Sequence, residues 1–423
     1  MTTAIALFAL TYVLMLAFSK RRTIIALASG AIFIVSGMLP TGDILPSLDF
    51  HVILMIAGTM GLVALFIESK MPSLLADIIM ERVPNVQMAA VALALFAGVI
   101  SAFVDNVATV LMVAPVALEI CHKLKTNPVP FIIGIAVSSN LQGAATLVGD
   151  TTAIMLGSAL DMSFMDFLFY DGKPGMFFAV ELGAVLSALI LAWIFRAEKG
   201  RIPKSSQRTI VKDYVPSILL VGTIVLLILA SFIPNKPGIT NGAICCALLV
   251  IGLGYNYSKK QKLSAIVDPL KSIDFETIGL LVGLFLMIGG ITHEGVIDAL
   301  AKALAELGRG NVFLMYTIIV WASVLISAFI DNIPYVATMI PVIAGLAAEM
   351  GCDPTPFYFG LLSGATLGGN CTPIGASANI TGIGILRRAG YEVKNSDFFR
   401  IGIPFTMAAV IPAYIYLWLM FGV

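Results

Sequence analysis

The chain has 423 residues, of which 59% are hydrophobic and 12% are charged, and its mean hydropathy is +0.99. Soluble proteins carry roughly a quarter charged residues, so this composition excludes an ordinary soluble protein and indicates a polytopic membrane protein whose surroundings are the lipid bilayer. The formal net charge is zero, so no nucleic-acid partner is expected.

Apolar runs near the ~20 residues that cross a bilayer recur along the whole chain, which predicts an all-α fold of about ten transmembrane helices. The first run has no basic leader and no small-residue cleavage site, so we expect a mature span and not a signal peptide. In chain order, the expected spans lie near residues 2–18, 23–39, 51–68, 130–160, 176–195, 214–233, 240–256, 276–293, 355–386 and 402–422.

Two further apolar segments, 86–120 and 312–348, carry an Asp-Asn pair near their centres: Asp105-Asn106 and Asp331-Asn332. Each segment has about 35 residues, which is short for two full crossings of a ~30 Å hydrocarbon core. We therefore expect each segment to form a re-entrant hairpin whose polar tip lies at the membrane midplane.

Basic residues cluster in alternating connections between the expected spans. By the positive-inside rule these connections face the cytoplasm, so both termini of this multi-pass protein of the inner (plasma) membrane are predicted outside. The clusters are Lys20, Arg21 and Arg22; His122, Lys123 and Lys125; Arg196, Lys199, Arg201, Lys204, Arg208 and Lys212; Lys259, Lys260 and Lys262; Arg387, Arg388 and Lys394.

The two halves of the chain repeat one another. Residues 101–120 and 327–346 share 8 of 20 positions without a gap, and SLDF at Ser47 matches SIDF at Ser272. Together with the loop charges, this predicts two inverted-topology repeats, a recurring construction of secondary transporters. We expect repeat 1 over 1–200, a cytoplasmic linker over 201–213 and repeat 2 over 214–423.

The spans at 130–160 and 355–386 are predicted to be broken helices, because Gly143, Gly149 and Pro373 disfavour a continuous helix. A break in the membrane leaves backbone N–H and C=O groups that an ion can satisfy. Hydroxyl and amide oxygens near the breaks offer ligands for sodium, although small polar residues also mediate helix packing. These candidates are Thr146, Thr151, Thr152, Thr372, Ser377 and Asn379.

Three aspartates in these segments, Asp105, Asp150 and Asp331, have no Lys or Arg at a helical spacing. An ionised Asp at a helix centre costs ~2.5 to 3.5 kcal/mol, so each should face a cavity, bind a cation or take up a proton. The alternative for Asp105 and Asp331 is a helix N-cap at the hairpin turn. Asp150 matches Ala376 in the second repeat, which suggests an asymmetric role such as proton exchange.

The segments DNVATVLMVAPV, NPVPFIIGIAVSSNLQGAATLVGD, SAFIDNIPYVATMIPV, GATLGGNCTPIGASANI and RRAGY resemble the ion transporter superfamily, in the branch that contains ArsB, NhaD and the pink-eyed dilution (P) protein. The resemblance implies two hairpins, two broken helices, elevator-like alternating access and a homodimer. Related divalent anion/sodium symporters carry Ser-Asn-Thr at the hairpin tips. Here the tips read Asp-Asn-Val at Asp105 and Asp-Asn-Ile at Asp331, which counts against a dicarboxylate.

The leading hypothesis is therefore a secondary active transporter coupled to Na⁺ or H⁺, with cation/proton antiport first, arsenite or antimonite efflux second, and inorganic anion or carboxylate symport third. A passive channel is a further alternative, and the chain has no hydrolase or metalloprotease motif that would indicate an enzyme. Apart from the transported or coupling ion, no cofactor is expected, and the five cysteines form no zinc-binding pattern.

We expect protons to be carried by Asp105, Asp150 and Asp331, and Na⁺ to lie near Asp105, Asn106, Thr146 and Asp150. The full set of predicted ion- or substrate-binding residues is Asp105, Asn106, Thr109, Asn140, Gly143, Thr146, Gly149, Asp150, Thr151, Thr152, Asp331, Asn332, Gly369, Asn370, Thr372, Gly375, Ser377 and Asn379.

Overall fold

The computed structural model describes residues 1–198, 200 and 208–422. Within these residues the chain forms twenty α-helices, short 3₁₀ helices and one small antiparallel hairpin of β1 (Phe169–Tyr170) and β2 (Lys173–Pro174). The predicted all-α fold is therefore confirmed. Residues 201–207 of the predicted linker, and Lys199 in its basic cluster, lie outside the described residues.

The first half of the chain contains ten α-helices. They are α1 (Thr2–Ala17), α2 (Arg22–Val35), α3 (Ile44–Ser47), α4 (Phe50–Glu68), α5 (Met71–Arg82), α6 (Val86–Ser101), α7 (Asn106–Leu124), α8 (Val129–Gln142), α9 (Thr151–Ala159) and α10 (Met176–Ile194). The 3₁₀ helices here are η1 (Ser19–Arg21), η2 (Thr41–Asp43), η3 (Gly143–Ala145), η4 (Met165–Phe167) and η5 (Phe195–Ala197).

The second half follows the same order. Its elements are α11 (Val215–Ser231), α12 (Thr240–Lys260), α13 (Ser264–Lys271), α14 (Phe275–His293), α15 (Val296–Gly308), α16 (Val312–Ser327), α17 (Asn332–Met350), α18 (Thr355–Gly368), η6 (Gly369–Cys371), α19 (Ser377–Arg388) and α20 (Asn395–Phe421). Both hairpins have the same form: α6 and α16 have 16 residues, and α7 and α17 have 19.

Seven of the described helices are long and apolar enough to cross a membrane, and the number is eight if α15 and α16, bent by 116°, form one broken span. Five shorter helices, among them α1 and α2, are also apolar. The expectation from sequence was about ten spans and two hairpins. Large apolar side chains such as Val35 (88% exposed) and Leu419 (63% exposed) lie on the outer surface, as lipid contact requires. The count of ten spans stays a prediction.

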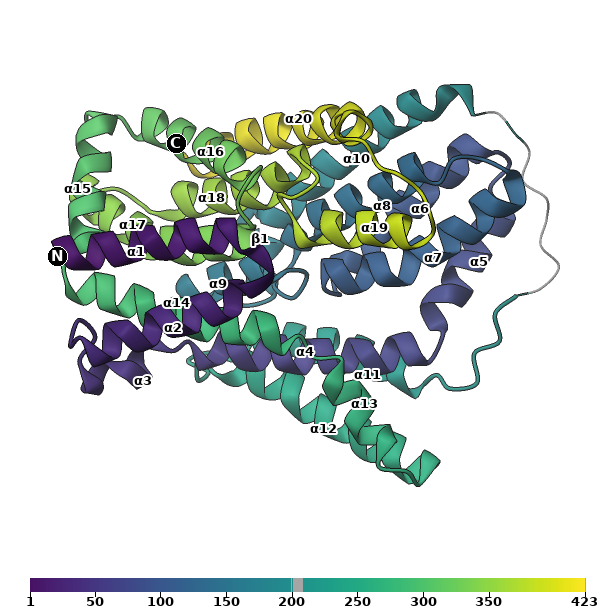
Figure 1. The fold of residues 1–423 in the computed structure, drawn as a ribbon, viewed down its shortest axis with the longest axis horizontal. Coiled ribbons are helices and arrows are strands. Elements are labelled where there is room, and N and C mark those ends of the chain that lie inside the picture. The colour runs from purple at the N-terminus through teal and green to yellow at the C-terminus, as the bar shows by residue number, and fades with distance from the viewer. Residues whose placement is uncertain (199, 201–207, 423) are drawn as a thin grey trace.

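The two halves run in opposite directions. In Figure 1 the hairpin of α6 and α7 lies in the right-hand part of the molecule, and that of α16 and α17 lies in the left-hand part. Likewise α8 leads leftward into α9, whereas α18 leads rightward into α19. Both termini lie toward the left, and the end of α10 and the start of α11 lie toward the right. The predicted inverted topology is confirmed, while the boundaries of the two repeats stay predictions.

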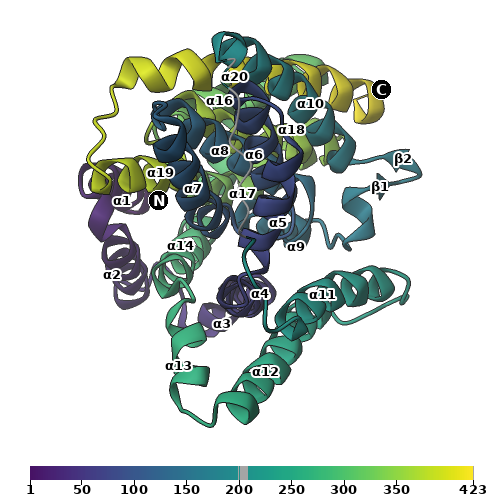
Figure 2. The same ribbon diagram turned by 90° about the vertical axis from the view of Figure 1, so that its right-hand side faces the viewer.

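When the molecule is viewed along its long axis, α3, α4 and α11 to α13 lie in its lower part, and α6 to α8, α10, α16, α18 and α20 lie in its upper part (Figure 2). We call α1 to α4 and α11 to α14 the scaffold group, and we call the hairpins, the broken helices, α5, α10, α15 and α20 the site group. Within the scaffold group α2 packs on α14 and α12 packs on α4. Gly283 lies directly against the backbone of Ala26, and its counterpart Gly58 lies against Cys245. Small residues allow this close approach of helices in a membrane.

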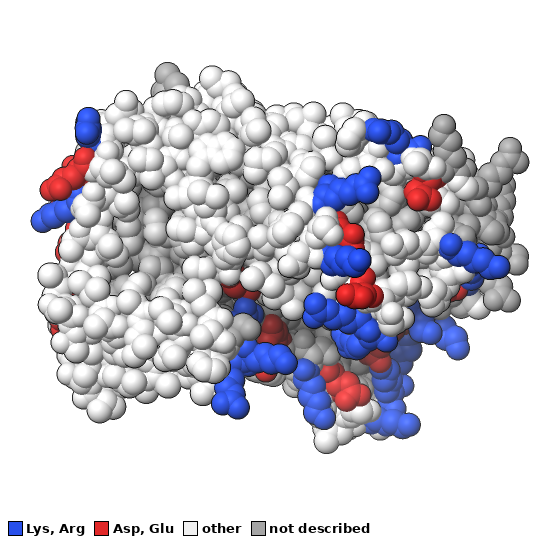
Figure 3. All heavy atoms as spheres, turned by 45° about the horizontal axis from the view of Figure 1, so that its top comes forward, with Lys and Arg blue, Asp and Glu red and all other residues white. Residues whose placement is uncertain are grey.

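Charged side chains are unevenly distributed over the surface. On the face in Figure 3, Lys and Arg gather over the right-hand part, and the left-hand part is nearly free of charge up to its outer end. The basic end is opposite both termini, as the positive-inside assignment expects, but Arg22 of the first predicted cytoplasmic cluster is paired instead with Asp331 at the second hairpin tip. Which end faces the cytoplasm stays a prediction.

Candidate functional site

The predicted breaks occur at equivalent places in the two halves. After η3 the backbone turns extended at Thr146 and again at Asp150 before α9 begins, and after η6 it does so at Thr372 and Ala376 before α19. The Thr146 hydroxyl donates a hydrogen bond to the Ala102 carbonyl. Its counterpart Thr372 donates to the Ala328 carbonyl. Each break is thus hydrogen-bonded to the turn of the hairpin in its own half.

Glycines make this contact between break and hairpin possible. A Cβ atom on Gly149 would lie 2.6 to 3.0 Å from three backbone carbonyl oxygens, those of Gly143 in η3 and of Ser101 and Ala102 at the end of α6. Gly375 has the same surroundings, at 2.6 to 2.9 Å. Glycine is required at these two positions for a steric reason, since a larger residue would push the broken segment away from the hairpin.

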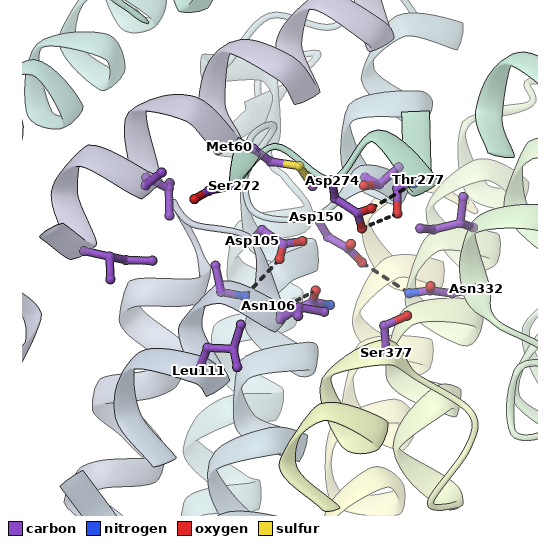
Figure 4. A pocket seen from close by; sticks show the side chains of 17 residues that line it. Met60, Asp105, Asn106, Leu111, Asp150, Ser272, Asp274, Thr277, Asn332 and Ser377 are labelled. Atoms are coloured by element: carbon purple, nitrogen blue, oxygen red, sulfur yellow. Dashed lines mark hydrogen bonds between the residues drawn. The ribbon is translucent and has the colours of Figure 1, made fainter. Parts of the chain in front are cut away.

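A cavity of about 440 Å³, called the central cavity below, lies where the hairpin tips, the start of α9 and the start of α14 meet. Carboxylates of Asp105, Asp150 and Asp274 line it from three separate elements (Figure 4). Its other polar lining residues are Asn106, Thr151, Ser272, Thr277, Asn332 and Ser377. No Lys or Arg is present among the described residues that line it.

Asp105 combines the two roles that the sequence left open. It is the N-cap of α7, because one oxygen, Oδ2, accepts a hydrogen bond of 3.0 Å from the Ala108 amide. The same carboxylate lines the central cavity. Capping fixes the orientation of the side chain without removing it from the cavity, so this aspartate is available to a bound cation.

Asp150 is different, because it stands in the N-cap position of α9 but makes no cap hydrogen bond. Its Oδ2 accepts instead from the Thr152 hydroxyl at 2.8 Å and from the Asn332 amide at 3.2 Å. The side chain is nearly buried, at 4% exposure. Asp150 therefore connects the broken helix of the first half to the hairpin tip of the second, and Ala376 cannot do the same in return.

Asp331 does not lie in the central cavity lining. Its Oδ2 accepts from Arg22 Nη1 at 2.6 Å and from the Ser377 hydroxyl at 2.8 Å, and its Oδ1 accepts from the Ile333 amide at 3.2 Å. Together with Arg22 it lines a second cavity of about 180 Å³. Sequence spacing had shown no basic partner for this aspartate, because Arg22 is 309 residues away and reaches it only in the folded chain.

Asp274 is a lining residue that sequence reasoning missed as a site residue. It caps α14 by accepting from the Thr277 amide at 3.0 Å and the Thr277 hydroxyl at 2.7 Å. Its counterpart Asp49 caps α4 in the same way, but its other oxygen accepts from the Ser158 hydroxyl at 2.5 Å. The repeated SLDF and SIDF motifs were the available signal, since an Asp that recurs in both halves of an inverted repeat belongs to the shared architecture.

A network of buried amides joins the two halves beneath the cavity. Asn106 donates to Asn140 at 3.1 Å, and Asn140 donates to Asn370 at 3.1 Å and to the Thr366 carbonyl at 2.7 Å. Asn370 in turn donates to the Val137 carbonyl at 2.8 Å. Asn140 and Asn370 are fully buried, so their partners there are other parts of the chain and not the cavity.

Six of the predicted site residues therefore line the central cavity: Asp105, Asn106, Asp150, Thr151, Asn332 and Ser377. The other twelve do not line it: Thr109, Asn140, Gly143, Thr146, Gly149, Thr152, Asp331, Gly369, Asn370, Thr372, Gly375 and Asn379. Across the described chain, no three His, Cys, Asp or Glu side chains group as metal ligands. A cation in the cavity would thus rely on amide, hydroxyl and backbone oxygens besides carboxylates.

An all-helical membrane chain with two inverted halves, two hairpins and a polar cavity between broken helices has the architecture of a secondary transporter. Comparison with known proteins agrees with this class. The chain belongs to the CitMHS family, described as "Citrate transporter", whose profile matches residues 12–359 and 243–423.

Similar proteins include bacterial chains named as uncharacterized transporters and a protein from mammals. The "Uncharacterized transporter Rv2684" of Mycobacterium tuberculosis is 32% identical over 434 residues, which cover 99% of this chain and 98% of that protein. The "P protein" of Homo sapiens is 26% identical over 98% of this chain, which spans 59% of the length of that protein. The resemblance to the branch of the P protein is therefore confirmed.

The fold also matches that of a solved transporter. The crystal structure of the YdaH transporter of Alcanivorax borkumensis superposes with a TM-score of 0.61, over 89% of this chain and 86% of that one. The sequence identity is 14%, so this likeness supports the fold alone.

Proposed function

We propose that the protein is a secondary active transporter coupled to Na⁺ or H⁺, and that the coupling ion binds in the central cavity between Asp105 and Asp150. One observation supports this most strongly. Three carboxylates line the cavity, and no Lys or Arg of the described chain lines it with them. Arg22, outside the lining, attracts Asp274, which leaves Asp105 and Asp150 without a basic partner. Uncompensated carboxylates at membrane depth are costly, so binding a cation or a proton there stabilises the protein.

Asp150 suits the role of the coupling residue. When ionised, it accepts hydrogen bonds from Thr152 and from Asn332, which lies at the tip of the other half's hairpin. A cation or proton that neutralises Asp150 weakens its hydrogen bond to Asn332, because bonds to an ionised acceptor are about twice as strong as neutral ones. The occupancy of the cavity is thereby coupled to a contact between the two halves, which alternating access requires.

Within this proposal the site group moves against the scaffold group in an elevator-like manner, and the protein acts as a homodimer. The central cavity lies between the groups: Met60 and Asp274 come from the scaffold group, and Asp105, Asp150 and Asn332 come from the site group. A ligand at such a boundary changes surroundings whenever one group slides past the other. Cation/proton antiport is the simplest reaction of this kind.

The test is ion exchange in proteoliposomes that contain the purified protein. An outward Na⁺ gradient should drive proton entry that saturates with Na⁺ concentration and is absent from protein-free vesicles. An imposed pH gradient should in turn drive Na⁺ against its own gradient. Flux that never saturates and moves neither ion uphill would identify a channel and contradict the proposal.

Carboxylate symport is the second candidate, and the family description "Citrate transporter" favours it. Four helices, α7, α9, α17 and α19, begin near the cavity, and helix N-termini favour anions. The acidic lining opposes an anion until a cation neutralises it, so this reaction also needs a coupling ion at Asp105 or Asp150. Citrate uptake that depends on Na⁺ or H⁺ would select symport, whereas ion exchange without any added carboxylate selects antiport.

Arsenite efflux has no support from the geometry of the cavity. The soft As(III) centre of arsenite is bound by thiolates, and no cysteine is found among the described residues that line the central cavity. Arsenite transport can be measured in the same vesicles, where we expect none above that of protein-free controls.

A further inference from the structure

We infer that Arg22 is a built-in counter-ion: it supplies the positive charge at the Asp331 half of the site, so that the transporter binds one coupling cation where the repeat would otherwise provide for two. This inference rests on the proposed function, because it assigns which of the two repeated aspartates receives an ion from solution. Both hairpin tips carry an Asp-Asn pair whose Asp is the N-cap of the following helix, but only the second has a guanidinium beside its Asp.

The contacts of the two tip aspartates differ in the way this inference requires. Asp331 has partners on both oxygens, and the Arg22 guanidinium reaches its Oδ2 at 2.6 Å. Asp105 accepts one bond from its own helix, at Ala108, and lines an acidic cavity. A cation is therefore already present beside one tip aspartate and has to come from outside for the other.

The position of Arg22 within the repeat shows why only one half has this charge. Arg22 lies four residues before Ala26, which packs on Gly283 of α14. The equivalent contact in the other half joins Cys245 to Gly58 of α4, and four residues before Cys245 stands Asn241. The equivalent position thus carries a neutral amide, whose oxygen accepts from Lys236 Nζ at 3.5 Å and which makes no hydrogen bond to Asp105 among the described residues.

Arg22 is also held in position against the second hairpin. Its side chain is 28% exposed and that of Asp331 is 11% exposed, so the pair is largely removed from water. On the neighbouring helix α1, the Tyr12 hydroxyl bonds to the Pro334 carbonyl at 2.7 Å and to Thr338 on α17. Because Arg22 is part of the chain, its positive charge is always present beside Asp331, and a sodium ion from solution would have to displace it from the carboxylate.

The test is the number of Na⁺ ions bound per chain, measured by calorimetric titration and by equilibrium binding of radioactive Na⁺ to the purified full-length protein in detergent. We expect wild type to bind one ion. Arg22→Asn, which introduces the residue of the equivalent position, should bind two, and Arg22→Lys should bind one. The charge-balanced double variant Arg22→Asn/Asp331→Asn should again bind one, which assigns the additional ion to Asp331.

A second variant keeps the inference testable if Arg22→Asn does not fold. Asp331→Asn alone should leave the stoichiometry at one ion, because Arg22 and not Na⁺ neutralises Asp331 in wild type. Loss of the bound ion in Asp331→Asn, or an unchanged stoichiometry in folded Arg22→Asn, would overturn the inference. Wild type that binds neither Na⁺ nor protons saturably would instead contradict the proposed function, so the two failures are distinguishable.

Discussion

Replacing Asp150 by Asn tests the coupling role of this residue with little change of shape. The carboxylate accepts hydrogen bonds from Thr152 and Asn332 through one oxygen, at 2.8 and 3.2 Å, and an Asn side chain oxygen can accept both. A hydrogen bond to a charged group contributes ~1.5 to 3 kcal/mol and one to a neutral group ~0.5 to 1.5 kcal/mol, so the two bonds together lose about 2 to 3 kcal/mol.

The removal of a charge from membrane depth offsets this loss. An ionised Asp costs ~2.5 to 3.5 kcal/mol at such a depth, so the free energy of unfolding should change by no more than about 1.5 kcal/mol. Cation binding should suffer far more, because a unit charge ~4 Å from a cation is worth about 4 kcal/mol at an effective dielectric constant near 20. Even if solvation recovers part of that attraction, we expect Na⁺ affinity to fall at least about 100-fold.

The assay compares Asp150→Asn with wild type in proteoliposomes, with proton flux followed as Na⁺ concentration is varied. Asp171→Asn, which changes an exposed aspartate in the β1–β2 turn, is the matched control and should behave as wild type. Thermal unfolding of the same preparations checks that the variant is folded. If Asp150→Asn retained wild-type Na⁺ affinity and ion-dependent proton flux, the coupling role derived for Asp150 would be wrong.

Three further predictions address the construction of the site. Gly375→Ala should lower the free energy of unfolding by about 1 to 3 kcal/mol, because its Cβ would lie 2.6 to 2.9 Å from three carbonyl oxygens. Gly222→Ala is the control and should not destabilise the protein, because no atom lies within 4 Å of the added Cβ. Equal melting temperatures of the two variants would contradict this prediction. Asn140→Ala should lower the melting temperature by leaving buried partners unpaired, at ~1 to 3 kcal/mol per group; unchanged melting would count against the amide network. Asp274→Asn should weaken Na⁺ binding by purified protein, and Asp49→Asn should not; equal effects would show that proximity to the cavity is not what matters.

Much of the fold could be predicted from sequence, because the signals were repeated. The Asp-Asn pairs at Asp105 and Asp331 marked both hairpins, and the glycine-rich segments marked both breaks. In each case one copy confirmed the other, and the loop charges supplied the opposite orientations. The exact helix ends depended on caps: Asp105 and Asp274 begin their helices by accepting backbone hydrogen bonds, which composition alone does not specify.

The sequence could not predict which polar groups that are distant along the chain contact one another in the fold. The partnership of Arg22 with Asp331 joins residues 309 positions apart, and no helical spacing reveals it. Asn140 and Asn370 were predicted as ligands by residue type, yet their amides satisfy each other and the backbone. Asp274 was recognised as part of a repeated motif, but only the packing of α14 against the hairpin tips brings its carboxylate to the cavity.

The most direct test of the central claim is an electron cryomicroscopy map of the protein prepared at high Na⁺ concentration, compared with one prepared without Na⁺. If Na⁺ binds in the central cavity, a density peak within coordination distance of Asp105 and Asp150 is present only with Na⁺, and no peak lies between Arg22 and Asp331. A cavity that is identical in both maps, or a peak bound to Asp331 with Arg22 displaced, would contradict it.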